Sequence, residues 1–300
     1  MRSVSRRRLL TGGGAAVIAA TAPSPLLART IRDAAGDDVA IGKLDRILSI
    51  GGDVTEIVFA LGEGRRVIAT DTTSVYPYEV MALPKVGYMR ALSTEGVLST
   101  SPDLILASAG SGPPEVIAAL KQSRIPLALV EYQAGPQAIA RKIAFIADIF
   151  DVKEKGAALS KSIAADLARL ARSLEGTARP RALFVLSLAG GRIIAAGHKS
   201  SAEEIITLAG GVNAVQGFDG YRQASAEAIL AAAPDVIVMM RRDGDVGADD
   251  LFAMEPFAGT PAAKTRSLIR MEGSLLLGFG PRTPQAARAL ARALHPGLDL

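Results

Sequence analysis

The feature that most constrains the fold is an internal repeat of fifteen residues. The segments 92-LSTEGVLSTSPDLIL-106 and 224-ASAEAILAAAPDVIV-238 align without a gap, and Ser, Glu, Leu, Pro, Asp and Ile coincide. Each segment combines a short helical stretch that carries a Glu with an apolar run typical of a buried strand. One structural unit is therefore expected twice, which predicts a pseudo-duplicated chain with two lobes.

The segments around the repeats alternate between strand and helix patterns. In the first half we predict strands at 46–52, 66–71, 103–108 and 126–131, and helices at 54–62, 93–100, 114–123 and 136–149. In the second half, 181-RALFVLS-187 mirrors 46-RILSIGG-52, and residues 204–210 mirror 56–62. Such alternation is typical of a parallel sheet covered by helices. The expected fold class is α/β, with two Rossmann-like lobes that each hold a parallel sheet and flanking helices.

Several helix starts and one further strand are expected from local signals. The pairs with capping-box spacing are Asp53 and Glu56, Asp151 and Glu154, and Ser201 and Glu204. The run 274-SLLLGFG-280 is strand-like. After it, Thr283 as a cap and Pro284 at the first helical position predict a final helix to about Leu294.

A long helix is expected between the two lobes. Residues 152–174 contain no proline, and apolar residues recur at helical spacing. A helix of about 23 residues is roughly 35 Å long, which is enough to join two lobes rigidly. We therefore predict lobes at 29–150 and 177–300 and a linking helix at 151–176. The alternative is a long surface helix of a single domain.

The first 28 residues resemble a twin-arginine export signal. The stretch 5-SRRRLL-10 is followed by an apolar run, and 23-PSPLLA-28 offers a cleavage site after Ala28. This stretch holds four of the 34 Lys and Arg residues and none of the 30 Asp and Glu residues, so residues 29–300 are formally neutral. The basic balance of the whole chain is therefore no sign of nucleic-acid binding. We expect a periplasmic protein that does not itself span the membrane.

The chain has no cysteine and two histidines, His198 and His295. This composition excludes disulfides, iron–sulfur clusters, Cys-ligated zinc and a His-rich metal site. A bound metal would need oxygen ligands. The segment 71-DTTSVYPYEV-80 places Tyr76 and Tyr78 around Pro77, in a loop at the carboxyl end of a predicted strand. Ligands bind at such strand ends in open α/β sheets, so this loop is the candidate site.

Five segments together resemble the periplasmic haem-binding proteins of bacterial haem ABC importers. They are 71-DTTSVYP-77, 87-GYMRALSTEGVLSTSPDLIL-106, 182-ALFVLS-187, 208-LAGGVNA-214 and 278-GFGPRTPQA-286. The resemblance extends from about Asp45 to His295. It implies a helical-backbone binding protein that holds haem between its lobes and delivers it to an ABC permease for haem and iron uptake.

The resemblance implies that Tyr76 is the axial ligand of the haem iron. Ferric iron prefers oxygen ligands, and tyrosine is among the side chains that hold haem iron. A free phenol ionises near pH ~10, so ligation at neutral pH requires the iron and a nearby cation to favour phenolate. Arg90 and Arg222 are the candidates for that cation or for binding a haem propionate, and these two roles stay open. Tyr221 and Met89 are further haem-binding candidates.

Glu95 and Glu227 occupy equivalent positions in the repeat, one in each lobe. Taken alone, each is typical of a solvated carboxylate near a helix start. The resemblance implies that this pair docks onto arginines of the permease.

We thus predict a monomeric binding protein with no catalytic residues and with haem as its bound ligand. A corrinoid or ferric-siderophore binding protein on the same scaffold is the first alternative. A chelatase-like enzyme is a second one, which the absence of Cys and the two dispersed His residues disfavour.

Overall fold

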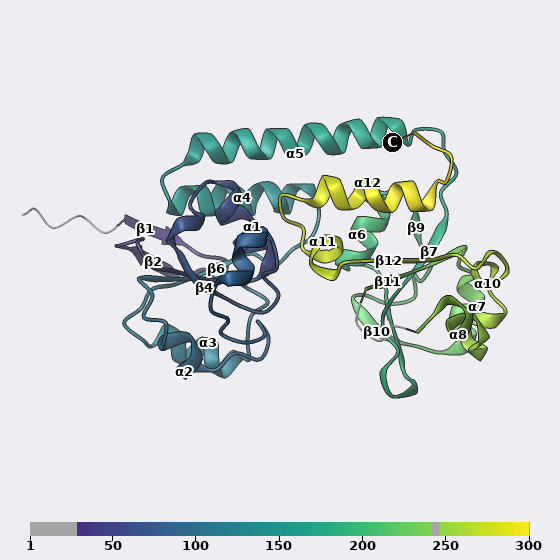
Figure 1. The fold of residues 1–300 in the computed structure, drawn as a ribbon, viewed down its shortest axis with the longest axis horizontal. Helices are drawn as coiled ribbons and strands as arrows, with labels where there is room; N and C mark the ends of the chain where they lie inside the picture. Colours follow the sequence, from purple (N-terminus) through teal and green to yellow (C-terminus); the bar gives the residue numbers. More distant parts are fainter. Residues whose placement is uncertain (1–28, 242–245, 300) are drawn as a thin grey trace, which may run out of the picture.

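The computed structural model describes residues 29–241 and 246–299. The leader predicted at 1–28 lies outside the described residues. Within the described part, two separate sheets form the centres of two lobes that lie side by side beneath one long helix (Figure 1). No helix in these two ranges has the length and apolar composition needed to cross a membrane.

The first lobe is built on a parallel four-stranded sheet. Its strand order is β4-β3-β5-β6, and all three strand pairings are parallel. Every residue of β3 and β5 is buried, as expected for strands covered on both faces. The strands are β3 (Ile47–Ile50), β4 (Val67–Thr70), β5 (Leu104–Ser108) and β6 (Leu127–Val130).

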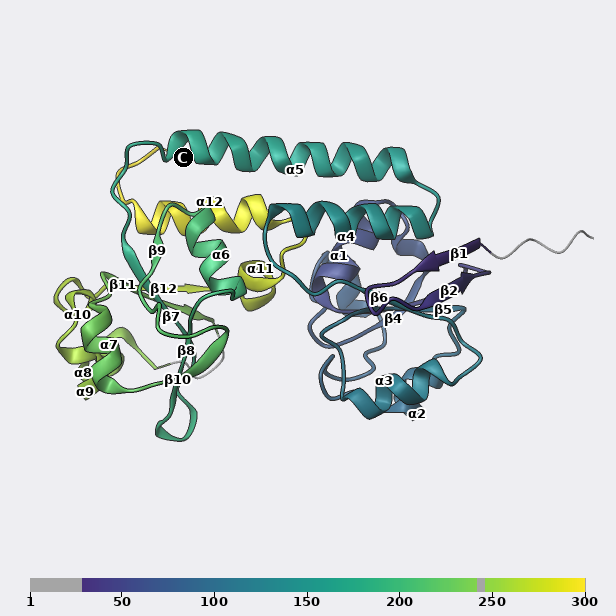
Figure 2. The same cartoon turned by 180° about the vertical axis from the view of Figure 1, so that it is seen from behind.

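Helices cover both faces of this sheet. One face packs on α1 and α4 and the other on α2 and α3, and each face has its own apolar core cluster (Figures 1 and 2). The helices are α1 (Gly52–Ala60), α2 (Thr94–Leu98), α3 (Pro114–Lys121) and α4 (Pro136–Ile149), with 3-10 turns η1 (Gly64–Arg66) and η2 (Tyr78–Ala82).

The capping box predicted at Asp53 and Glu56 is wrong. Helix α1 begins at Gly52 behind Gly51, which has a φ of 107° that favours glycine, and no side chain caps this end. Asp53 and Glu56 lie inside the helix and are buried. Each pairs with a cation from another part of the chain, which offsets the cost of burying its charge. Their spacing therefore serves tertiary ion pairs rather than the helix start.

The polar segment ahead of β3 forms a hairpin that the sequence did not reveal. Strands β1 (Arg29–Arg32) and β2 (Asp38–Ile41) pair in antiparallel fashion. Asp33 closes the turn, since its Oδ1 accepts hydrogen bonds from the N–H groups of Ala35 and Asp37. Ile31, Val39 and Ile41 bury their side chains in the first-lobe core.

Helix α5 (Lys153–Ser173) is the long helix that the sequence predicts. It packs against α4 of the first lobe and against α12 of the second, and it runs over both lobes in both views (Figures 1 and 2). Its predicted capping box is wrong. Residue Val152 precedes the helix without a side-chain cap, and Asp151 has a φ of 56° in the turn after α4.

The second lobe has a mixed six-stranded sheet. Its order is β10-β8-β7-β11-β12, with β9 paired to β7. The pairings of β11 with β7 and β12, and of β7 with β9, are parallel. The strands are β7 (Arg181–Ser187), β8 (Ile193–Ala196), β9 (Val212–Asn213), β10 (Tyr221–Ala224), β11 (Val236–Met240) and β12 (Leu268–Met271).

The two-lobed α/β fold is confirmed, but the second sheet is not wholly parallel. Strand β8 is antiparallel to β7, and β10 is antiparallel to β8. The 3-10 turn η3 (Ala189–Gly191) joins β7 to β8, and Gly190 and Gly191 both have positive φ. Adjacent glycines between two apolar runs are a hairpin signal that makes an antiparallel pair.

Seven helices surround the second sheet in the described residues. They are α6 (Ser201–Leu208), α7 (Ala226–Ala232), α8 (Ala248–Ala253), α9 (Glu255–Ala258), α10 (Pro261–Thr265), α11 (Gly273–Leu277) and α12 (Thr283–Leu294). The cap of α6 is Ser200, which accepts a hydrogen bond from the Glu203 N–H. The predicted pair Ser201 and Glu204 is thus one residue too late.

The strand expected at 274–280 is also wrong, because residues 274–277 belong to helix α11 and residues 278–280 form no strand. Glu272 caps the helix by accepting hydrogen bonds from the N–H groups of Ser274 and Leu275. The strand that pairs with β11 at the edge of the sheet is instead β12, which precedes this segment in the chain. The final helix α12 begins at Thr283, and Arg282 precedes it without a side-chain cap. The prediction of Thr283 as the cap and Pro284 as the first helical residue is therefore wrong by one residue.

The repeat has the same geometry in both lobes. Ser93 caps α2 and Ser225 caps α7 through the same side-chain contact with the third following N–H group. The repeated aspartates match as well. Asp103 accepts a hydrogen bond from the Arg46 N–H (3.0 Å), and Asp235 accepts one from the Arg181 N–H (2.8 Å). Each aspartate thereby fixes the start of the central strand beside it.

Candidate functional site

The loop that carries Tyr76 leaves the carboxyl end of β4 and is held by the buried Asp71. Asp71 Oδ1 accepts hydrogen bonds from the Gly51 N–H (2.9 Å) and the Ser74 hydroxyl (2.7 Å). Its second oxygen accepts from the Thr73 N–H (2.8 Å). One carboxylate thus ties the loop to the start of α1, which fixes the backbone that leads to Tyr76.

Lys85 closes the other side of the loop. Its Nζ donates to Thr70 Oγ1 (2.7 Å) and to the carbonyl oxygens of Ser74 (2.8 Å) and Val80 (3.1 Å). Burial lowers the pKa of Lys85, and the charge of Asp71 offsets part of that effect. Both ends of the tyrosine loop are therefore fixed, while its tip faces solvent.

Tyr76 projects from this fixed loop and is 45% exposed. The guanidinium carbon of Arg282 lies 4.0 Å from the centroid of its ring, which is a cation–π contact. Tyr78, two positions later, is 86% exposed in η2. Tyr76 is thus the tyrosine of the pair that contacts a cation.

Arg282 comes from the second lobe, in the loop between α11 and α12. It donates to the Glu56 carboxylate of α1 and lies 3.5 Å from Ser274 Oγ, and its side chain is 16% exposed. Its Nε is buried and has no hydrogen-bond partner among the described residues. A free donor therefore lies near Tyr76.

A second buried ion pair lies beside the first. Lys142 Nζ on α4 donates to Asp53 Oδ2 on α1 at 2.7 Å, and the two side chains are 1% and 7% exposed. Burial raises the pKa of the Glu56 carboxyl, and the hydrogen bond and charge of Arg282 offset part of that rise. Burial acts to lower the pKa of Arg282, but Glu56 outweighs it and the net direction is upward. Two acids on α1 are thus matched by two cations.

The two predicted arginines lie elsewhere. Arg90 is exposed, donates to the Tyr132 hydroxyl at 2.8 Å, and has its guanidinium carbon 5.6 Å from the centroid of that ring. Arg222 is exposed on β10. The sequence prediction named these two as candidate cations for Tyr76, whereas the residue that contacts the ring is Arg282.

Tyr221 begins strand β10 of the second lobe, next to Arg222. Its hydroxyl bonds Ser201 Oγ at 2.7 Å, and its ring packs edge-on against Phe184 with centroids 6.3 Å apart. Burial raises the pKa of Tyr221, and its hydrogen bonds with Ser201 and with the backbone of Ala202 offset part of that rise. The hydroxyl of Tyr221 is therefore held within the second lobe by Ser201.

Met89 lies in the first-lobe core rather than at this boundary. Its side chain is 8% exposed and belongs to the cluster that contains Leu92 and Val97. This placement does not support a contact between Met89 and a ligand.

Glu95 on α2 and Glu227 on α7 are both exposed and follow their caps at the same distance. The pKa of the Glu227 carboxyl is lowered by hydrogen bonds from the backbone N–H of Glu227 and from the Ser225 hydroxyl. Helices α2 and α7 lie on the side of the molecule away from α5 (Figures 1 and 2). The two helices that carry these glutamates thus lie on one side of the two-lobed chain.

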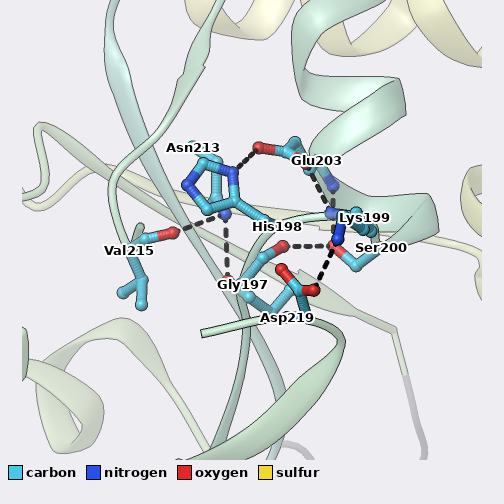
Figure 3. A network of polar contacts seen from close by, with 9 residues as sticks. Gly197, His198, Lys199, Ser200, Glu203, Asn213, Val215 and Asp219 are labelled. Atoms are coloured by element: carbon cyan, nitrogen blue, oxygen red, sulfur yellow. Dashed lines mark hydrogen bonds and ion pairs between the residues drawn. The ribbon is translucent and has the colours of Figure 1, made fainter. Parts of the chain in front are cut away.

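His198 belongs to a polar network at the start of α6 (Figure 3). Its Nδ1 bonds Glu203 Oε1 at 2.6 Å, and Glu203 also accepts from the Lys199 N–H at 2.7 Å. Lys199 Nζ in turn donates to Asp219 Oδ2 at 2.8 Å. No group of three or more His, Cys, Asp or Glu residues suited to a metal ion occurs in the described part of the chain.

The sequence prediction missed the ion-paired residues Glu56, Lys142 and Arg282, and it missed Tyr132 as the partner of Arg90. Arg282 stands within the segment 278-GFGPRTPQA-286, which carried part of the resemblance, but nothing in its local pattern indicates a contact with Tyr76. The contact arises where a second-lobe loop meets the first lobe.

These lobes, their linking helix and the loop at the boundary define a class of two-lobed binding proteins. The profile of the family described as periplasmic binding protein matches residues 47–275. The chain belongs to this family, whose members include substrate-binding proteins of transporters.

Two solved structures are similar over most of the chain. The periplasmic heme-binding protein BhuT in complex with two hemes is 39% identical, with a TM-score of 0.77, and the match covers 83% of this chain and 97% of that one. The apo form of the periplasmic heme-binding protein RhuT from Roseiflexus sp. RS-1 is 33% identical, with a TM-score of 0.81, over 86% of this chain and 100% of that one.

Curated relatives extend this comparison. The uncharacterized ABC transporter substrate-binding lipoprotein YvrC of Bacillus subtilis (strain 168) is 29% identical over 272 residues, which are 89% of this chain and 85% of that protein. A vitamin B12-binding protein of Vibrio parahaemolyticus is 27% identical over 199 residues, which are 66% of this chain and 71% of that protein.

Proposed function

We propose that this protein captures haem between its two lobes and delivers it to an ABC permease for haem and iron uptake. The observation that carries the proposal is the exposed Tyr76 beneath the Arg282 guanidinium. It is supported by the likeness to two heme-binding proteins at 39% and 33% identity. The cargo is ferric haem, one per chain, and the protein acts as a monomer.

Tyr76 is the proposed axial ligand of the iron. A phenolate oxygen is a hard ligand that suits ferric iron. The Arg282 guanidinium is cationic at every physiological pH and favours the phenolate over the phenol by its charge. Arg282 thereby takes the role of the supporting cation in this proposal, in place of Arg90 or Arg222.

Arg90, Arg222 and Tyr221 are proposed to bind the two haem propionates. Guanidinium groups bind carboxylates through charge-assisted hydrogen bonds. Arg90 is exposed and held by Tyr132, so it keeps other N–H groups for a ligand. Tyr221 adds a hydroxyl from the second lobe beside them.

The protein is proposed to act by binding and release, without bond-making chemistry. Glu95 and Glu227 form the proposed contact with cations of the permease, one carboxylate per lobe. Delivery then requires that both lobes face the permease together, which the position of α2 and α7 on one side of the molecule supports.

Residues 1–28 are proposed to direct export to the periplasm by the twin-arginine route. The consecutive Arg6, Arg7 and Arg8 ahead of the apolar run support this route. Replacing these three with Lys should retain the protein inside the cell, and continued export of the variant through the same route would contradict the proposal.

A corrinoid is the alternative ligand, because vitamin B12-binding proteins are among the relatives. Equilibrium titrations of the purified protein with ferric haem, cyanocobalamin and a ferric siderophore separate these ligands. We expect saturable binding of haem at one per chain and affinities at least about 100-fold weaker for the other two. Tighter binding of cyanocobalamin than of haem would replace the proposed ligand with a corrinoid.

A further inference from the structure

Glu56 is the one acid that pairs with Arg282 among the described residues. It lies on α1 of the first lobe with 6% of its side chain exposed, whereas Arg282 belongs to the second lobe. The next acid on the same helix, Asp53, is already paired with Lys142. The charge of Glu272 contributes to the raised pKa of Arg282. Its carboxylate, however, accepts the hydrogen bonds that cap α11.

Close packing leaves the Arg282 loop little freedom against α1. A Cβ atom added at Gly280 would lie 3.4 Å from Glu56 Oε2 and 3.5 Å from the Cα of Asp53. A Cβ at Gly52 would lie 3.8 Å from the Cβ of Ser274. The second-lobe segment 274–282 thus lies directly on the start of α1, where Glu56 meets the guanidinium.

We propose that Glu56 is a positioning residue, which holds Arg282 over Tyr76 so that this cation favours iron ligation by the phenolate. The inference rests on the proposed function, and it adds a residue that does not touch the ligand itself. With one Nη group bound to Glu56 and the planar group over the ring, Nε stays free as a buried donor. Glu56 therefore determines where the cation lies and which of its donors remain available.

Positioning and simple charge compensation predict opposite effects when Glu56 is replaced. Its negative charge alone opposes a nearby phenolate, so removing that charge from a fixed arrangement would strengthen iron ligation. If instead Glu56 holds Arg282 in place, its removal frees a flexible cation to turn toward solvent, and iron ligation weakens. The sign of the change distinguishes the two roles.

The test compares Glu56→Met, Arg282→Met and the double variant with the wild type. Methionine keeps most of the buried volume and removes the acceptor. Each protein is titrated with ferric haem and with iron-free protoporphyrin IX, and the ratio of the two dissociation constants is the readout. A general loss of structure weakens the binding of both ligands and leaves the ratio unchanged, whereas an effect on iron ligation changes the ratio.

We expect Glu56→Met to shift the ratio against ferric haem by at least about tenfold, because an opposite charge close to an ionised group favours it by about 1–3 pKa units. Arg282→Met should do the same. The double variant should match Arg282→Met, since Glu56 acts through Arg282 and its buried carboxyl takes up a proton once that cation is gone, so it no longer opposes the phenolate. The high-spin phenolate charge-transfer band should weaken in all three.

An unchanged ratio in Glu56→Met, or a shift in favour of ferric haem, overturns the proposal. If Glu56→Met does not fold, the double variant replaces a buried pair with apolar groups and still gives a test. A ratio in the double variant that differs from that of Arg282→Met then overturns it. Failure of the proposed function is a separate result, because the wild type itself would not bind ferric haem saturably.

Discussion

Arg282 of the second lobe places its guanidinium carbon 4.0 Å from the ring centroid of Tyr76 in the first lobe. The proposed iron ligand and the cation that contacts its ring thus belong to different lobes. Glu56 ties the same arginine back to the first lobe through a buried ion pair. Under the proposed function, iron ligation and the packing of the two lobes depend on each other.

Arg90 provides a test of propionate binding. Arg90→Gln should weaken ferric haem binding by about tenfold or more, because a hydrogen bond to a charged group contributes about 1.5–3 kcal/mol. Its spectrum should stay that of a tyrosine-ligated haem. Haem dimethyl ester, which lacks the carboxylates, should bind wild type and variant equally well. An equal loss for the ester would assign Arg90 to another role.

The buried pair of Lys142 and Asp53 predicts a large effect on stability. Lys142→Met leaves the Asp53 carboxylate buried without its cation, and the free energy of unfolding should fall by about 3–5 kcal/mol. Urea denaturation measures this change. Lys199→Met is the matched control, because Lys199 and its partner Asp219 have side chains that are 80% and 53% exposed. Loss of this exposed pair should leave the denaturation midpoint unchanged. Equal effects of the two variants would contradict the difference in burial.

Tyr221 predicts a specific dependence on alkaline pH. Its pKa is raised by burial above the ordinary value of 10.0, so its contribution to stability is complete below pH 10 and is lost as pH rises above that value. At pH 7, Tyr221→Phe should cost about 1 kcal/mol through the lost hydrogen bond to Ser201. The difference in unfolding free energy between wild type and variant should shrink above pH 10. A constant difference across that range would count against a buried phenol.

Glu95 and Glu227 predict a contact that involves both lobes. Reversal of both charges to Lys should reduce the apparent affinity for permease-containing vesicles by at least about tenfold, because like charges then face each other. Haem affinity should not change. Glu175→Lys, at another exposed site, serves as the control for charge alone. An apparent affinity for the vesicles that the double reversal leaves unchanged would exclude this pair from docking.

The repeat made much of the fold predictable. Glu95 and Glu227 lie at equivalent places on short helices of the two lobes as the repeat predicts, and α4 has the predicted bounds of 136–149. These features depend on residues close in sequence, where caps and apolar periodicity act directly.

Features that depend on distant partners were not predictable. Asp53 and Glu56 have the spacing of a helix cap, yet Lys142 and Arg282 pair with them instead. The Arg282 contact with Tyr76 has no local signal for the same reason, because it forms only when the second-lobe loop packs on the first lobe. Segment 274–277 formed a helix because Glu272 caps it, a contact that its apolar run conceals.

The central claim is that Tyr76 holds the iron of a bound haem. A visible-spectrum titration of the purified protein with ferric haem tests it directly, run beside Tyr76→Phe and the matched control Tyr78→Phe. The account predicts saturable one-to-one binding with a high-spin phenolate charge-transfer band that is lost in Tyr76→Phe and kept in Tyr78→Phe. A wild type without a saturable change, or a band that persists in Tyr76→Phe, would contradict it.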